Sequence, residues 1–169
     1  MDDGEDVENS PACGISTTEE MRTGGKQAKR RGALLEVRSG VTPLNVLVVD
    51  DEALVRWSVS ETLTECGYCV TQASDALSAF EALKSLGGSA DLVLLDLKLP
   101  DSSDLGVLSM MRRLSPATPV ILMTVHGSEA LTTEARARGA YSVINKPFDM
   151  SALPSLVHKA MQASRPELQ

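Results

Sequence analysis

Short apolar runs recur along the chain from Leu44 onward, and longer segments whose apolar residues follow a helical spacing separate them. Apolar runs of this length, bounded by turn residues, predict buried strands. We expect five strands, at residues 44–49, 68–72, 91–96, 119–124 and 141–145. Nearly all-apolar strands that alternate with helices favour a parallel sheet that helices cover on both faces.

The intervening segments predict five helices, at residues 52–66, 75–86, 105–114, 128–139 and 149–164. Asp75 and Ser128 are expected to cap helix starts, and Gly67, Gly87 and Gly139 lie where helices should stop. The buried face of the first two helices is expected to carry Leu54, Val55, Val59 and Leu63, and then Leu77, Phe80, Leu83 and Leu86. The whole pattern predicts a doubly wound (βα)5 fold of the α/β class, in which ligands bind at the carboxyl ends of the strands.

Residues 1–43 differ from the rest of the chain. They hold Gly, Ser and Thr clusters and an acidic block followed by a basic one, with no sustained apolar period. Such a segment cannot bury enough apolar surface to offset its ordering entropy. We therefore expect a disordered N-terminal tail at residues 1–43 and one folded domain at residues 44–169. The basic run Lys26–Arg31 is interpreted as a solvated segment rather than a site for an anionic surface.

Composition narrows the class of protein. The chain has 169 residues, 43% of them hydrophobic but only 3% aromatic, so one aliphatic core is expected. The net charge of -7 argues against a general nucleic-acid binder. No apolar run approaches the roughly 20 residues of a membrane span, and the acidic N-terminus does not resemble a secretory signal. These features favour a cytoplasmic protein, in which Cys66 and Cys69 are core thiols rather than zinc ligands.

Polar side chains stand where four of the five expected strands end. They are Asp50 and Asp51 after the first strand, Asp96 at the end of the third, Thr124 at the end of the fourth and Lys146 after the fifth. Parallel strands bring these positions to one edge of the sheet. Adjacent carboxylates raise the cost of ionising one another and need a cation, and Mg²⁺ binds one or two carboxylates together with a phosphate oxygen. The pattern predicts a phosphoryl-transfer site in which Asp96 could act as the nucleophile.

Four segments resemble the response-regulator receiver domain of two-component signalling: "VLVVDDE", "LVLLDLKLPD", "VILMT" and "GAYSVINKPF". The segments "VRW" and "MTVHG" are most similar to receivers of the nitrogen-regulatory type. The resemblance covers residues from about Leu44 to Ala163 and implies a flavodoxin-like parallel sheet with strand order 2-1-3-4-5. The initial Met and the tail favour a stand-alone receiver over a fragment of a longer regulator.

The resemblance also implies a role for each site residue. Asp96 is similar to the phosphoacceptor, and Asp51 and the backbone carbonyl of Lys98 are similar to Mg²⁺ ligands. Asp50 would contact the metal through water. Thr124 and Lys146 match the switch hydroxyl and the phosphate-binding lysine of the family, and the Lys146–Pro147 bond matches one that is usually cis.

By the same resemblance, the input partner would be a sensor histidine kinase or a phosphotransfer protein. The output would be a protein partner that contacts the fourth helix, the fifth strand and the fifth helix, and a dimer that forms on phosphorylation remains open. Direct nucleic-acid or membrane binding is not expected. Two alternatives stay open: an enzyme that uses an aspartyl phosphate to hydrolyse or transfer phosphate, and a degenerate receiver used only for protein docking.

Some positions depart from the family pattern. Val143 replaces an aromatic residue three positions before the lysine, and Tyr141 lies on the same side of that strand. Asp104 stands where a glycine usually follows the phosphoacceptor loop. Lys98, Val125 and His126 are expected to set the lifetime of the phosphoryl group, with Lys98 and Val125 obstructing the attacking water.

Overall fold

The computed structural model describes residues 43–88, 90–102 and 104–164 of the chain. The predicted disordered tail therefore lies outside the described residues, except for Pro43. No helix in the described ranges is long and apolar enough to cross a membrane.

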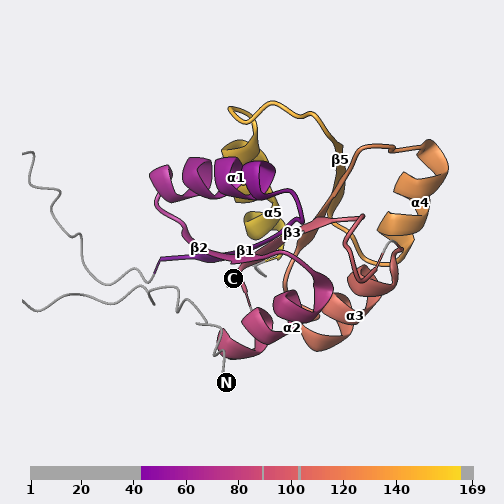
Figure 1. Ribbon diagram of the computed structural model, residues 1–169, viewed down its shortest axis with the longest axis horizontal. Coiled ribbons are helices and arrows are strands. Elements are labelled where there is room, and N and C mark those ends of the chain that lie inside the picture. Colours follow the sequence, from indigo (N-terminus) through magenta and orange to yellow (C-terminus); the bar gives the residue numbers. More distant parts are fainter. Residues whose placement is uncertain (1–42, 89, 103, 165–169) are drawn as a thin grey trace, which may run out of the picture. The chain divides into compact units, whose positions relative to one another are not determined.

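Five strands alternate with five helices along the described chain (Figure 1). The strands are β1 (Asn45–Val49), β2 (Cys69–Ala73), β3 (Leu92–Asp96), β4 (Val120–Thr124) and β5 (Ser142–Asn145). The helices are α1 (Ala53–Glu65), α2 (Ala76–Ser85), α3 (Gly106–Leu114), α4 (Glu129–Ala137) and α5 (Leu153–Ser164). The predicted strands are confirmed to within one residue at each end.

The strands form one parallel sheet in the order β2-β1-β3-β4-β5, which confirms the predicted flavodoxin-like topology. The strand order reverses at β1, which pairs with β2 on one side and with β3 on the other. Val46, for example, is in register with Val70 on one side and with Leu92 on the other. In such sheets the ligand site lies at this switch point, beyond the carboxyl ends of the strands.

Alternate residues of each strand feed two separate cores. In β1, Val46 and Val48 pack with apolar residues of α1 and α5, whereas Leu47 and Val49 pack with residues of α2, α3 and α4. Figure 1 shows α1 and α5 on one side of the sheet and α2 and α3 on the other. The period-two alternation of a strand that is buried on both faces explains this division. The core is aliphatic, as the composition predicted.

The predicted helix boundaries follow from local chemistry. Asp75 accepts a hydrogen bond from Ser78 N at 2.7 Å, and Ser128 Oγ accepts one from Leu131 N at 3.1 Å, so both caps are confirmed. The three glycines predicted to stop helices all have positive φ values, between 73° and 95°: Gly67, Gly87 and Gly139. Such a backbone conformation is strained for a residue with a side chain.

Two details of the helix prediction are wrong. Leu54 and Leu77 were placed on buried faces, but their side chains are 81% and 65% exposed. Both lie in the first turn of a helix, where spacing alone does not determine which side faces the sheet. The last helix begins at Leu153 rather than near residue 149, because the Asp149 side chain first forms a turn by accepting hydrogen bonds from Ser151 N and Oγ.

Candidate functional site

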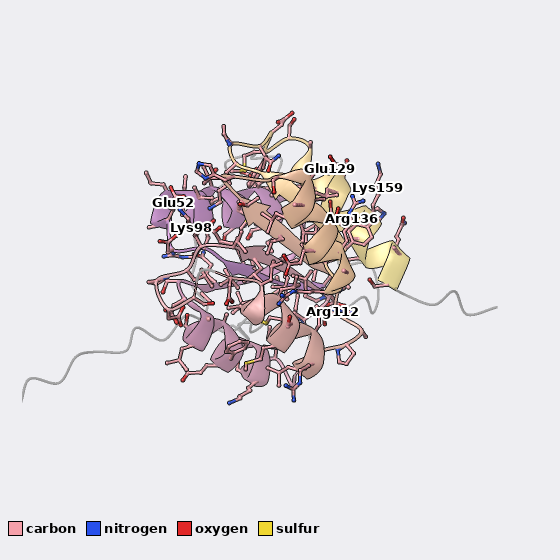
Figure 2. All side chains as sticks on the ribbon, turned by 90° about the vertical axis from the view of Figure 1, so that its right-hand side faces the viewer. Glu52, Lys98, Arg112, Glu129, Arg136 and Lys159 are labelled. Carbon is pink, nitrogen blue, oxygen red and sulfur yellow. The ribbon has the colours of Figure 1, made fainter. Side chains whose placement is uncertain are left out.

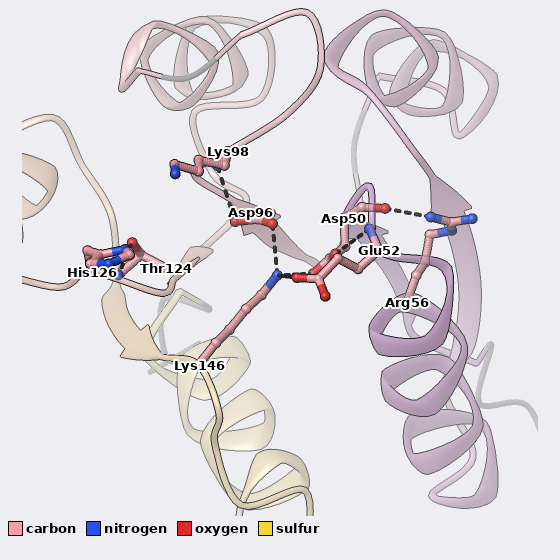
Figure 3. Close-up of polar contacts among 8 residues, drawn as sticks. All are labelled: Asp50, Glu52, Arg56, Asp96, Lys98, Thr124, His126 and Lys146. Carbon is pink, nitrogen blue, oxygen red and sulfur yellow. Dashed lines mark hydrogen bonds and ion pairs between the residues drawn. The ribbon is translucent and has the colours of Figure 1, made fainter.

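Polar side chains gather at the carboxyl edge of the sheet, where the sequence predicted them. Asp50 follows β1 and is fully buried, Asp96 ends β3 at 5% exposure, and Thr124 ends β4 at 4% exposure. The Lys146 side chain, after β5, is only 8% exposed. Four segments that are far apart in the sequence therefore place charged or hydroxyl groups in one partly closed site (Figure 3).

The alternation of side chains between the two faces of the sheet determines which of these side chains meet. Asp50, Asp96 and Lys146 continue the alternation of Val48, Leu94 and Ile144, which all face the α1 and α5 side of the sheet. Thr124 continues the opposite alternation, that of Leu122, which faces the α4 side. In Figure 3, Thr124 accordingly lies away from the group that surrounds the lysine.

Lys146 joins the acidic residues of the site. Its Nζ atom lies 2.8 Å from Asp96 Oδ2 and 2.7 Å from Asp50 Oδ2, and 3.5 Å from Glu52 Oε1. Its backbone N donates a hydrogen bond to Thr124 O at 2.7 Å, and the Lys146–Pro147 peptide bond is cis. The backbone of β4 therefore fixes the position from which the ammonium reaches the two aspartates.

Burial and charge shift the ionisation of this group. Burial is the main cause that raises the pKa of Asp50, and the charge of Asp96 raises it further, while the Lys146 ammonium and Glu52 N act in the opposite direction. Burial by itself would lower the pKa of Lys146, but its two aspartate partners outweigh burial and the net pKa is raised. The lysine faces two carboxylates, which raise its pKa, whereas Asp50 faces one ammonium, which lowers its pKa, and a second carboxylate, which raises it.

The carboxylates of the site suit a small divalent cation. Oxygens of Asp50, Glu52 and Asp96 lie within 4.8 Å of one another. Asp50 Oδ2 is buried, and among the described residues no hydrogen bond of acceptable geometry reaches it, although Lys146 Nζ is close. Carboxylate oxygens are the ligands that Mg²⁺ prefers, and a cation here would offset the repulsion between them. The residues present therefore fit Mg²⁺.

The structure brings Glu52, which the sequence analysis did not single out, into the cluster of three carboxylates. Asp51, which the family resemblance implied as a ligand, is exposed and is not part of that cluster. The signal for Glu52 was present in "VVDDE", where a third acidic residue follows the aspartate pair. Only the geometry of the turn shows which of the adjacent carboxylates faces Asp96 and Lys146.

Other predicted site residues form hydrogen bonds at the same edge of the sheet. Lys98 N donates to Asp96 Oδ1 at 3.2 Å, so the loop after β3 contacts the carboxylate directly, while the Lys98 side chain is exposed. Thr124 Oγ1 accepts a hydrogen bond from His126 N at 3.2 Å. Figure 3 shows that Lys98 lies on one side of Asp96 and Glu52 on the other.

A small apolar pocket of about 300 Å³ opens beside the site. It lies between the starts of three loops and is lined by Glu52, Val55, Val125, Lys146, Pro147, Phe148 and Met150. Val125 is 53% exposed there. The pocket gives solvent and small molecules a route to the edge of the acidic cluster that is partly shielded by apolar side chains.

A parallel sheet of this order, with two buried aspartates and a lysine at its switch point, matches the receiver-type arrangement that the sequence predicted. The model of the response regulator receiver domain family matches residues 46–158. The chain belongs to the response-regulator receiver domain family.

Relatives and solved structures agree with this assignment. The chain is 31% identical over 125 residues to the DNA-binding transcriptional regulator NtrC of Proteus hauseri, covering 74% of this chain and 26% of that protein. It is 30% identical over 122 residues to the transcriptional regulatory protein FixJ of Bradyrhizobium diazoefficiens, covering 72% of this chain and 58% of FixJ. The receiver domain of NtrX from Brucella abortus superposes with a TM-score of 0.64 at 34% identity, covering 69% of this chain and 98% of that domain. The chain thus spans about a quarter of the length of the NtrC relatives.

Proposed function

We propose that the chain receives a phosphoryl group on Asp96 from the phosphohistidine of a sensor kinase or phosphotransfer protein. The observation that carries this proposal is the placement of Lys146 Nζ between Asp96 Oδ2 and Asp50 Oδ2 at 2.8 and 2.7 Å. An Asp96 oxygen attacks phosphorus, the bond from phosphorus to the donor's imidazole nitrogen breaks, and that nitrogen takes up a proton. Lys146 offsets the charge that accumulates on the phosphoryl oxygens.

Asp50 and Asp51, together with Asp96 and the backbone carbonyl of Lys98, are proposed to hold Mg²⁺ next to the acceptor. The buried Oδ2 atom of Asp50, which lacks a well-formed hydrogen bond, supports this proposal. When bound, the metal would supply positive charge to the phosphoryl oxygens.

Phosphorylation is proposed to bias Thr124 and Lys146 toward the phosphoryl group and thereby change the surface of α4, β5 and α5. Thr124 supports this role because it ends β4 directly before the loop that leads to α4. Such a change selects a downstream protein partner, or a second copy of the chain, by shifting a population between two states. Val143, where the family carries an aromatic residue, packs against the core on the α4 side of the sheet.

Lys98, Val125 and His126 are proposed to lengthen the lifetime of the phosphoryl group. Val125 lines the apolar pocket beside Lys146, and Lys98 and His126 flank Asp96 and Thr124. Apolar and bulky side chains at this position obstruct the approach of water to phosphorus. In the same proposal the protein works in the cytoplasm and is not a turnover enzyme.

The test is to incubate the full chain with acetyl phosphate and Mg²⁺ and to follow its mass. A single phosphoryl adduct that depends on Mg²⁺ and is absent in Asp96→Asn supports the proposal. Rapid and continuous release of phosphate without an adduct would indicate an aspartyl-phosphate enzyme instead. Absence of any adduct would indicate a domain used for docking alone.

A further inference from the structure

The guanidinium of Arg56 clamps the loop that carries the acidic residues. Arg56 Nη1 donates to the backbone carbonyl of Asp50 at 2.6 Å, from the first turns of α1 back to the end of β1. Figure 3 shows the guanidinium directed at Asp50 from the side opposite Lys146. Arg56 is half-buried, and among the described residues it forms no ion pair with a carboxylate. The guanidinium therefore binds a backbone carbonyl next to the site rather than a carboxylate.

Few other contacts hold the backbone of this loop. Glu52 precedes α1 but its side chain makes no capping hydrogen bond, and the first turn of the helix has no acidic residue. Lys146 Nζ contacts the side chains of Asp50 and Glu52. The other backbone hydrogen bonds of the loop are short-range or lead back to the sheet: Glu52 N donates to Asp50 Oδ1, Arg56 N donates to Glu52 O, and Asp50 N donates to Ala73 O. The Arg56 side chain is thus the one described side chain outside Asp50–Glu52 that fixes the backbone of Asp50.

The position of that backbone sets the direction of the carboxylates. Asp50 is fully buried, so its carbonyl needs an internal partner, and without Arg56 the peptide would rotate to find another one. A rotation there would move the Asp50 and Asp51 side chains, because they are attached to the same short turn. Contacts that orient metal ligands typically change metal affinity by about 10-fold to 100-fold when they are removed.

We propose that Arg56 is a positioning residue for the metal site, which holds the Asp50 carbonyl so that the carboxylates of this loop converge with Asp96. This inference rests on the proposed function, because it assumes that these carboxylates bind a divalent cation. Arginine suits this role because its guanidinium stays charged at all physiological pH values and its donors have a fixed geometry.

The chain contains a matched control. Arg112 Nη1 donates to the Thr118 carbonyl at 2.6 Å, also across six residues and also half-buried, but it extends from α3. Figure 2 shows that Arg112 lies well away from Glu52 and the acidic site. Arg56→Met and Arg112→Met therefore remove the same kind of bond at two places, and only the first is next to the carboxylates.

The test measures binding of Mn²⁺ to the full chain from the electron paramagnetic resonance signal of the free ion, followed by competition with Mg²⁺. Mn²⁺ is used because it accepts the same oxygen ligands. We expect Arg56→Met to weaken Mn²⁺ and Mg²⁺ binding by about tenfold, Arg112→Met to keep the parent affinity, and Arg56→Lys to restore most of the loss. If Arg56→Met fails to fold, Arg56→Gln carries the same expectation.

Parent-like affinity in Arg56→Met, or equal weakening in Arg56→Met and Arg112→Met, would overturn the role of Arg56 while leaving the proposed function intact. An Arg56→Lys variant no better than Arg56→Met would also overturn it, because the donated hydrogen bond would then not be the cause. If the parent chain itself binds no Mn²⁺, the proposed metal site fails, and the role of Arg56 fails with it.

Discussion

Lys146 Nζ lies 2.8 Å from Asp96 Oδ2, and both side chains are more than nine-tenths buried. If Asp96 is the acceptor, as proposed, the lysine lies on the side of its carboxylate at which positive charge would be needed when a phosphoryl group arrives. Without that group, the same ammonium compensates the two aspartates. We therefore expect Lys146 to stabilise the fold in addition to its proposed role in phosphoryl transfer.

Replacing this lysine should reveal its stabilising role. Lys146→Met leaves Asp50 and Asp96 buried without their ammonium partner, and removing one member of a buried pair typically costs about 3 to 5 kcal/mol. We expect a loss of this order in the free energy of unfolding, measured with urea in the presence of a metal chelator. Saturating Mg²⁺ should recover part of it, since an ion that binds the folded state stabilises that state.

Lys159→Met is the control for that experiment, because Lys159 is an exposed lysine on α5, far from the acidic loop (Figure 2). Its free energy of unfolding should match that of the parent. An unchanged unfolding curve for Lys146→Met would show that the contacts of the ammonium with the aspartates do not stabilise the chain.

Substitutions of the adjacent residues Asp51 and Glu52 are expected to weaken Mg²⁺ binding to different extents. Asp51→Ala should lose Mg²⁺ binding and phosphorylation while keeping the fold, because Asp51 is exposed and surface substitutions usually change stability by less than about 0.5 kcal/mol. Glu52→Gln should weaken Mg²⁺ binding less, because Glu52 lies in the carboxylate cluster but the family resemblance gives the ligand role to Asp51 and not to Glu52. Metal titration and thermal unfolding of both variants measure this. Normal phosphorylation of Asp51→Ala would refute the role assigned to Asp51.

The lifetime of the phosphoryl group should depend on Val125. Its side chain lines the pocket that contains Lys146, so Val125→Ala should open a path for water and raise the autodephosphorylation rate several-fold. The decay of the phosphorylated mass measures the rate. Leu54→Ala serves as the control, because Leu54 is an exposed apolar residue outside this pocket. If Val125→Ala loses its phosphoryl group no faster than the parent, Val125 does not obstruct the attacking water.

The Asp75 cap of α2 gives a prediction about pH. The hydrogen bond from Ser78 N is the main cause that lowers the pKa of Asp75 below its ordinary value of 3.8. A carboxylate whose pKa falls on folding stabilises the protein above pH 3.8 and loses that contribution as the pH falls through the lower folded value. Asp75→Ala should therefore cost about 1 kcal/mol near pH 6 and less in acid.

The free energy of unfolding of the parent and of Asp75→Ala is measured with urea at several pH values. A range of about pH 3 to pH 7 covers the ordinary pKa of an aspartate. Glu81→Ala, an exposed substitution on the same helix, should show no such trend. A difference between parent and Asp75→Ala that grows in acid would contradict the sign of the pKa shift.

Much of the fold followed from the sequence because most strands are short apolar runs that end at a polar residue or directly before one. The same logic located Asp50, Asp96, Thr124 and Lys146, since parallel strands bring their carboxyl ends to one edge. The family resemblance supplied the strand order, which periodicity alone does not determine.

Side-chain direction within turns could not be predicted in this way. Glu52 and Asp51 are neighbours with the same charge, and only the backbone path after β1 decides which one approaches Lys146. Arg56 has no sequence signal for its bond to the Asp50 carbonyl, because that bond depends on how α1 packs against the sheet. Leu54 and Leu77 were misplaced for a related reason, since both lie in first turns whose orientation the sheet determines.

The most direct test of the central claim is to map the phosphoryl group after the full chain reacts with acetyl phosphate and Mg²⁺. The account predicts one phosphoryl group, found on the peptide that contains Asp96, and its loss when Mg²⁺ is chelated or when Asp96 is replaced by Asn. A phosphoryl group on another residue, or an adduct that persists in Asp96→Asn, would contradict the account.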